Sequence, residues 1–308
     1  MKTTTLVLLT IALSAALVVA QDAQKEKTSL YTQFVENIKG DAEKQKFAYE
    51  QGQEYLRKYG GDQDQYVDYV RKWSTKYEKA KRETDFNNAL VAKDYPKSFA
   101  AGKEILAKDG ESSVVLARLV EAGYRQAQAG NKSLNAESIQ FARRALALVD
   151  TGKVTDPAPF KSMDDLKGFL NYTLGWLIQE NAPVEAAELA RKAAEFGGAY
   201  KQEAATYVLL ATAIIRGEYE PQAKEYNEKY SGKDATPEGE AMAARLKAVA
   251  ERVMDSYARA VALLTKPEQQ QYKTTVMEEL SSLYKTFHNN SDAGLNEFIA
   301  SVLTKPLP

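Results

Sequence analysis

The stretch Leu210–Ala223, Leu-Ala-Thr-Ala-Ile-Ile-Arg-Gly-Glu-Tyr-Glu-Pro-Gln-Ala, carries the pattern that decides the fold. A small residue, Ala211, lies in the middle of an apolar helical run, a Gly-x-Tyr turn begins at Gly217, and a second small residue, Ala223, opens the next run. Two helices that cross closely need small residues at their contact, with large ones in the grooves beside it. The stretch therefore predicts two antiparallel helices joined at Gly217.

The same helical pattern extends through the chain beyond Ser29. Apolar residues recur at spacings of three and four, glycine and proline fall between the amphipathic stretches, and alternating β-branched runs are scarce. The sequence predicts an all-α protein. The expected helices are 41–59, 63–82, 84–93, 96–108, 112–129, 135–150, 163–180, 184–196, 200–216, 220–230, 237–264, 269–287 and 292–303.

A second copy of the pattern begins at Leu174-Gly175-Trp176, and its second helix opens at Pro183 with Ala186. Two weaker copies precede it, one around Asp94-Tyr95 and one that pairs Ala117 with Ser138. The arrangement resembles the tetratricopeptide repeat, a helix-turn-helix unit of about 34 residues, and the chain as a whole is similar to secreted bacterial proteins.

The resemblance implies antiparallel helix-turn-helix repeats stacked as an α-solenoid; an irregular α-bundle is the alternative. The implied organisation is a signal peptide over 1–20, an N-terminal segment over 21–40, a helical cap over 41–83, repeats over 84–237 and a second cap over 238–308.

In repeats of this family the first helix of each pair lines a concave groove that binds a protein or peptide. Counting from Ala117, Gly175 and Ala211 as equivalent small contact residues, the resemblance implies the following groove residues: Arg118, Glu121, Tyr172, Trp176, Gln179, Thr212 and Arg216. Aromatic and arginine side chains are common at binding hot spots.

The first twenty residues have the pattern of an export signal. Lys2 precedes a short apolar run, Leu6–Val19, and small residues end at Ala20. Cleavage is expected before Gln21, which makes the protein secreted or periplasmic. No later run is long enough to span a bilayer, so no transmembrane anchor is expected in the mature chain.

Composition argues against several classes of function. The net charge is −1, which offers no basic field for nucleic acid. One histidine, His288, and no cysteine argue against a zinc site, and no phosphate-binding glycine loop follows a strand. We expect no cofactor, no metal site and no catalytic residue, and therefore a non-catalytic binding scaffold.

A carbohydrate-active enzyme of the cell wall, or a carbohydrate-binding protein, on an α-superhelical fold is the alternative function. Adjacent carboxylates at Asp164-Asp165 point about 100° apart on a helix and do not form a facing pair. The 18 tyrosines are expected to pack mainly in helix interfaces, with an aromatic binding strip as the alternative.

Three polar clusters are expected to serve helix ends. Asp62 and Asp64 are typical of a helix N-terminus rather than a calcium loop. His288 is expected to lie at a helix C-terminus or on the surface, and Ser291 or Asp292 to cap the last helix. Thr151–Ser162, with two prolines, is expected to be an irregular connector.

Overall fold

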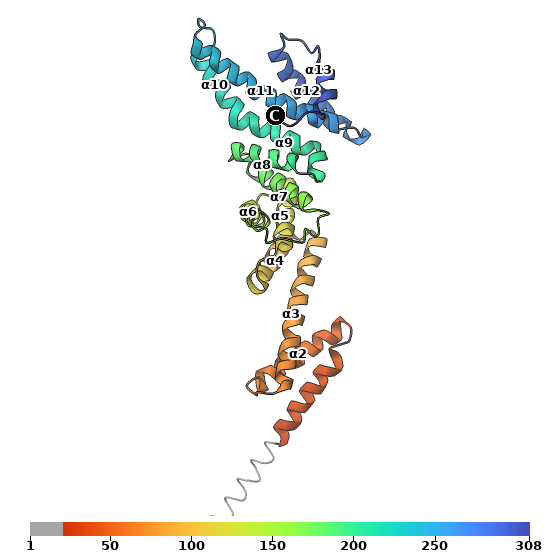
Figure 1. The fold of residues 1–308 in the computed structure, drawn as a ribbon. Coiled ribbons are helices and arrows are strands. Elements are labelled where there is room, and N and C mark those ends of the chain that lie inside the picture. Colours follow the sequence, from red (N-terminus) through yellow and green to blue (C-terminus); the bar gives the residue numbers. More distant parts are fainter. Residues whose placement is uncertain (1–20) are drawn as a thin grey trace, which may run out of the picture. The chain divides into compact units, whose positions relative to one another are not determined.

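The computed structural model describes residues 21–308, and every regular element in this range is helical. The predicted signal peptide, residues 1–20, lies outside the described residues. A first helix covers residues 21–37. The later helices, seen in Figure 1, are α2 (Ala42–Tyr59), α3 (Gln65–Val91), α4 (Tyr95–Asp109), α5 (Ser113–Gln128), α6 (Asn135–Asp150), α7 (Met163–Ile178), α8 (Pro183–Glu195), η1 (Ala199–Gln202), α9 (Ala204–Ile214), η2 (Ile215–Tyr219), α10 (Glu220–Lys229), α11 (Pro237–Leu263), η3 (Pro267–Gln269), α12 (Gln270–Phe287) and α13 (Leu295–Val302).

The prediction of an all-α chain is confirmed for this range. None of the helices in residues 21–308 has the length and apolar character that crossing a bilayer requires. The chain divides into two compact units, one that ends at Asn88 and one that begins at Ala89.

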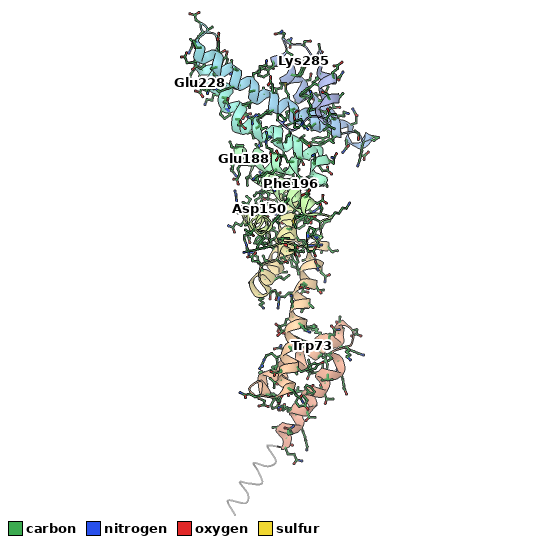
Figure 2. The ribbon with its side chains drawn as sticks, in the orientation of Figure 1. Trp73, Asp150, Glu188, Phe196, Glu228 and Lys285 are labelled. Atoms are coloured by element: carbon green, nitrogen blue, oxygen red, sulfur yellow. The ribbon has the colours of Figure 1, made fainter. Side chains whose placement is uncertain are left out.

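The first unit has its own aromatic core. Phe34 from the helix over 21–37, Tyr55 from α2 and Val70 from α3 are each at most 1% exposed and pack together. Trp73 stands over Phe34 edge to face, with ring centroids 5.2 Å apart, and is labelled in Figure 2. The residues over 21–37, which the sequence pattern left without a helix, therefore supply part of this core.

In the second unit the helices from α4 to α9 pack consecutively, each on the next. In addition, α7 contacts both α5 and α9. The helix α6 lies against α5 and α7, and the helix α8 lies against α7 and α9. Thus α5, α7 and α9 share one layer, and α6 and α8 back it. The long helix α11 then packs on α9 and carries α12 and α13 (Figure 1).

Local signals fix several helix N-termini as expected. Asp94, Ser112 and Ser162 accept hydrogen bonds from the backbone N–H groups of Lys97, Val115 and Asp165, which satisfies donors left free at helix N-termini. The connector over 151–162 is irregular, and its Phe160 packs on Phe169 with ring centroids 5.0 Å apart.

The break predicted between 82 and 84 is wrong, because α3 continues to Val91. Thr84 and Asp85 look like a helix start in sequence. In the structure Asp85 lies inside the helix and pairs with Lys81 one turn earlier, with Nζ and Oδ2 2.5 Å apart. An ion pair at this spacing stabilises a continuous helix.

The turn predicted at Gly217 is also wrong. The chain stays helical from α9 through the π-turn η2 into α10, and the Glu220 N–H bonds to the carbonyl of Ile215 five residues earlier. Pro221 explains the wider turn, because in a regular helix its ring would clash with the carbonyl four residues before it, that of Gly217. The hairpin instead reverses over residues 230–236, and α11 packs back on α9 and α10.

Candidate functional site

A row of four aromatic side chains crosses the layer formed by α5 and α7: Tyr200, Tyr172, Tyr124 and Trp176. The loop that carries Tyr200 fixes one end of this row. Two adjacent carboxylates at the start of α7 hold this loop: the Gly197 N–H donates to Asp164 Oδ2 at 3.1 Å, and the Ala199 N–H donates to Asp165 Oδ1 at 2.6 Å. The paired carboxylates therefore bind backbone rather than facing each other across a cleft. They bring η1, and with it Tyr200, against α7.

Gly168 leaves room for the Tyr200 side chain on α7. A Cβ at this position would lie 3.1 Å from the Tyr200 Cβ, tighter than an ordinary contact. Tyr200 can therefore approach α7 closely, and its ring lies tilted against that of Tyr172, with ring centroids 5.2 Å apart. The row continues from Tyr172 to Tyr124 of α5 at 6.1 Å and from Tyr124 to Trp176 at 5.0 Å, both edge to face.

The predicted groove residue Tyr172 lies at the buried centre of this row. It is 7% exposed, and its hydroxyl lies 3.3 Å from that of Tyr124. Burial raises the pKa of Tyr172 well above its usual range, and the hydrogen bond with Tyr124 and the nearby phenols of Tyr200 and Tyr272 raise the pKa further. The ring is thus a packing residue, and the half-buried Trp176, Tyr124 and Tyr200 form the accessible part of the row.

The equivalence of Ala117 and Gly175 is wrong, and this error hid Tyr124. A Cβ on Gly123 would lie 1.8 Å from Ser138 Oγ, so α5 and α6 approach each other closely at Gly123. Gly175 meets α8 in the same manner, with Ala186 O at 3.2 Å from an added Cβ. An aromatic residue follows each of these two glycines, and this pairing was the sequence signal for Tyr124. Tyr200 lies in the short helix η1, and the sequence pattern placed it at the start of the expected helix 200–216 without marking it as a site residue.

The other predicted groove residues fall into two groups. Arg118 and Glu121 line a cleft of about 520 Å³ formed by residues 90–95 and α5. Glu121 also accepts a hydrogen bond from Arg125 Nη2 at 2.7 Å. The pKa of Tyr200 is raised mainly by burial, then by the nearby Tyr124, and then by the charge of Glu121. On α5, Glu121 precedes Tyr124 of the row by about one turn.

The remaining three lie toward the C-terminal end of α7 and of α9. Gln179 donates to the Trp176 carbonyl at 3.0 Å, and Thr212 donates to the Val208 carbonyl at 3.0 Å, so both side chains bond within their own helix. Arg216 is exposed on the π-turn. The pKa of Glu180 is lowered mainly by its hydrogen bond to Lys132, and the charge of Arg216 lowers it further.

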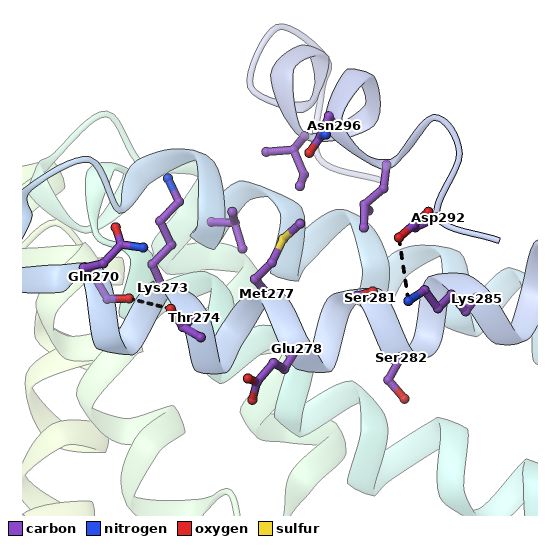
Figure 3. Close-up of a pocket in the computed structure, with 13 residues that line it drawn as sticks. Gln270, Lys273, Thr274, Met277, Glu278, Ser281, Ser282, Lys285, Asp292 and Asn296 are labelled. Atoms are coloured by element: carbon purple, nitrogen blue, oxygen red, sulfur yellow. Dashed lines mark hydrogen bonds and ion pairs between the residues drawn. The ribbon is translucent and has the colours of Figure 1, made fainter. Parts of the chain in front are cut away.

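Another cleft lies elsewhere, between α12 and α13, and has a volume of about 820 Å³ (Figure 3). Met277 forms part of an apolar floor, with Val261, Leu295 and Ile299. The rim carries both signs of charge, and Lys285 Nζ lies 3.7 Å from Asp292 Oδ2. Nothing in this lining pairs a nucleophile with a base.

The polar clusters at helix ends act structurally. Asp64 accepts from the Tyr66 and Val67 N–H groups at 2.9 Å and pairs with Lys27, as expected for a helix N-terminus. His288 follows α12 and its Nδ1 lies 2.8 Å from the Tyr284 carbonyl. Ser291 and Asp292 do not cap the last helix, whose N-cap is Gly294 with φ of +88°. Within residues 21–308 no group of three or more His, Cys, Asp or Glu side chains is placed to hold a metal ion.

Comparison with known proteins leaves the residues themselves as the basis for function: no family model matches the sequence, and no curated protein or solved structure shows significant similarity to it.

Proposed function

We propose that the second unit is a tetratricopeptide-like α-solenoid that binds an extended polypeptide across α5 and α7, without catalysis of its own. The aromatic row carries this proposal. Its accessible rings, Tyr124, Trp176 and Tyr200, come from α5, α7 and η1 and offer apolar faces with hydrogen-bonding edges. Such side chains supply much of the affinity at protein interfaces.

Charged pairs flank the row and would orient a peptide. Glu121 and Arg125 lie on the α5 side, and Lys132 pairs with Glu180 at 2.9 Å toward the end of α7. Exposed pairs such as these contribute little to stability, so their charges are available to select polar groups of a partner. Both signs are present, which favours a peptide of mixed charge over a polyanion.

Peptide selection followed by calorimetry tests the proposal. The chain from Gln21 is panned against a displayed peptide library, and recovered peptides are synthesised and titrated. Trp176→Ala should weaken their binding by more than about tenfold, or about 1.4 kcal/mol. Val184→Ala is the matched control, because Val184 is 52% exposed on α8 in the backing layer.

Two results would contradict peptide binding at the row: recovery of no peptide with saturable binding, or equal affinities for Trp176→Ala and the parent chain. Saturable binding to a glycan array, reduced by Trp176→Ala, would instead support the carbohydrate-binding alternative. Melting curves of each variant separate lost binding from lost folding.

Export is part of the proposal and rests on residues 1–20 of the sequence. Expression of the full chain followed by N-terminal sequencing of the exported fraction should give Gln21 as the first residue. A product that begins at Met1 and stays with the membrane would be incompatible with cleavage after Ala20.

A further inference from the structure

Residues 303–308 are held against the second unit through their backbone. Arg259 Nη2, from α11, donates to the carbonyl of Lys305 at 3.0 Å and to that of Pro306 at 2.8 Å. Arg191, from α8, donates to the backbone oxygen of Pro308. Guanidinium groups from two helices thus contact three backbone oxygens within four residues of an irregular segment, and those of Lys305 and Pro306 are peptide carbonyls.

Arg259 is positioned for this role by a buried carboxylate. Arg259 is 5% exposed and Asp255, one turn earlier, is 8% exposed. Asp255 Oδ1 accepts from Arg259 Nε at 2.6 Å, which fixes the guanidinium and directs Nη2 to the carbonyls. A buried ion pair is costly to desolvate and needs its remaining donors satisfied. The segment supplies the acceptors.

The contact accommodates proline at positions 306 and 308. Arg191 and Arg259 offer donors only, because a guanidinium has no acceptor. Pro306 and Pro308 lack a backbone N–H. At these positions the segment therefore offers a backbone oxygen to the guanidinium groups and has no N–H that would need an acceptor. Lys305 and Pro306 are exposed on their outer side, and the segment is therefore not enclosed by the fold.

An open cleft adjoins the end of this segment. It has a volume of about 630 Å³, and Pro308 forms part of its wall together with Met254, Tyr284, His288 and Phe298. The Tyr284 and His288 rings are stacked, with centroids 3.7 Å apart and an angle of 3° between their planes. Aromatic walls of this kind receive proline rings of extended peptides.

We propose that Arg191, Arg259 and the adjoining cleft form a binding site for extended, proline-containing peptides, and that residues 303–308 occupy it as an exchangeable internal ligand. The site is separate from the aromatic row and does not depend on it. A peptide that displaces the segment would make the same carbonyl contacts and extend into the cleft.

Fluorescence anisotropy with a labelled Leu-Thr-Lys-Pro-Leu-Pro peptide, the sequence of residues 303–308, tests the site. The chain from Gln21 is compared with the same chain carrying Pro306→Gly and Pro308→Gly, which restores N–H groups and loosens the internal segment. The peptide should bind the loosened chain at least about tenfold more tightly than the parent, because the internal ligand competes in the parent. A Leu-Thr-Lys-Gly-Leu-Gly peptide should bind more weakly.

Further substitutions in the loosened chain identify the donors. Arg259→Lys keeps a charge for Asp255 but loses the forked donor geometry, and should weaken peptide binding at least about tenfold. If Arg259→Lys disturbs folding, Arg191→Gln tests the other donor, because the Arg191 side chain is 32% exposed. It should also weaken peptide binding. Trp176→Ala, in the aromatic row, should leave binding of this peptide unchanged.

Three results would overturn the proposal. The peptide could show no saturable binding to the loosened chain, or the glycine peptide could bind as tightly as the proline peptide. A concentration-dependent dimer of the parent chain that the peptide dissociates, measured by light scattering, would assign the site to the segment of a second copy.

Discussion

At Gly123 the absence of a methyl group sets how closely α5 and α6 pack. An added Cβ would meet Ser138 at both its Oγ, 1.8 Å away, and its Cβ, 2.9 Å away. The Ser138 hydroxyl is fixed by donation to the Leu134 carbonyl at 2.7 Å and therefore has little freedom to move aside. A side chain at this position therefore cannot be accommodated without a shift of α5 or α6.

Gly123→Ala should lower the free energy of unfolding by about 1–3 kcal/mol through overpacking, although alanine is favoured over glycine in a helix by about 1 kcal/mol. Urea denaturation followed by circular dichroism measures the change. Gly175→Ala is the matched control, because its nearest contact is 3.2 Å, and it should lose less. Equal or greater stability of Gly123→Ala would contradict the close contact.

The buried tyrosines make stability sensitive to alkaline pH. Burial raises the pKa of Tyr172 and raises that of Tyr257 to about 12, whereas an unfolded tyrosine ionises near pH 10. The unfolded chain therefore releases its phenol protons first, so stability is unaffected below about pH 10 and falls as the pH rises from there toward the folded pKa values.

Urea denaturation at several pH values between about 8 and 12 measures this loss, with a limiting slope of about 1.4 kcal/mol per pH unit for each such tyrosine. Tyr172→Phe should reduce the slope above pH 10, because it removes one of the groups. An unchanged slope in Tyr172→Phe would show that another residue is responsible.

At the scale of elements, helix ends were predictable where capping is local, and helix continuity was not. Ser112 and Ser162 cap the helices that follow them, and the signal lies in the few residues around each cap. At Thr84 and Asp85 two local signals compete: both residues are typical of a helix start, whereas the ion pair of Asp85 with Lys81 favours a continuous α3. The helix also continues through Gly217, where it packs against the start of α8, some thirty residues earlier in the sequence.

Gly217→Ala distinguishes a contact from a turn. An added Cβ would lie 3.0 Å from the Val184 N and 3.2 Å from the Pro183 carbonyl carbon, at the start of α8. We expect a loss of about 1–3 kcal/mol in the free energy of unfolding, as for other overpacked contacts. A gain of about 0.4–1 kcal/mol, typical of Gly→Ala in a permissive turn, would restore the turn interpretation. Differential scanning calorimetry or urea denaturation measures either outcome.

For the whole molecule, the apolar and aromatic cores of the two units are the source of stability. The chain has no cysteine, and residues 21–308 contain no cluster of metal-binding side chains. Thermal melts with and without EDTA should therefore superimpose. A melting temperature several degrees lower in EDTA would point to a metal bound by an arrangement of oxygen ligands outside such clusters.

The all-α class and most helix bounds followed from periodicity, whereas the site followed only in part. Spacing from assumed small contact residues selected Trp176, which lies in the proposed row, and Glu121, which lines the cleft beside α5. Tyr172 was chosen by the same rule but points into the row, where Tyr124 and Tyr200 cover it. Spacing gives the face of a helix, and the exposure of that face depends on what a neighbouring loop places over it.

The π-turn η2 also acts as an angular adjustment between α9 and α10. Each residue of a helix advances the direction of the next side chain by about 100°. The half-buried side of α10 carries Ala223, Tyr226 and Tyr230. Deleting one residue from Ile215–Tyr219 would rotate that side by about 100° relative to α9, away from α11. The number of residues in this segment is thus constrained by the packing of α10. Substitutions, which keep that number unchanged, would not reveal the constraint.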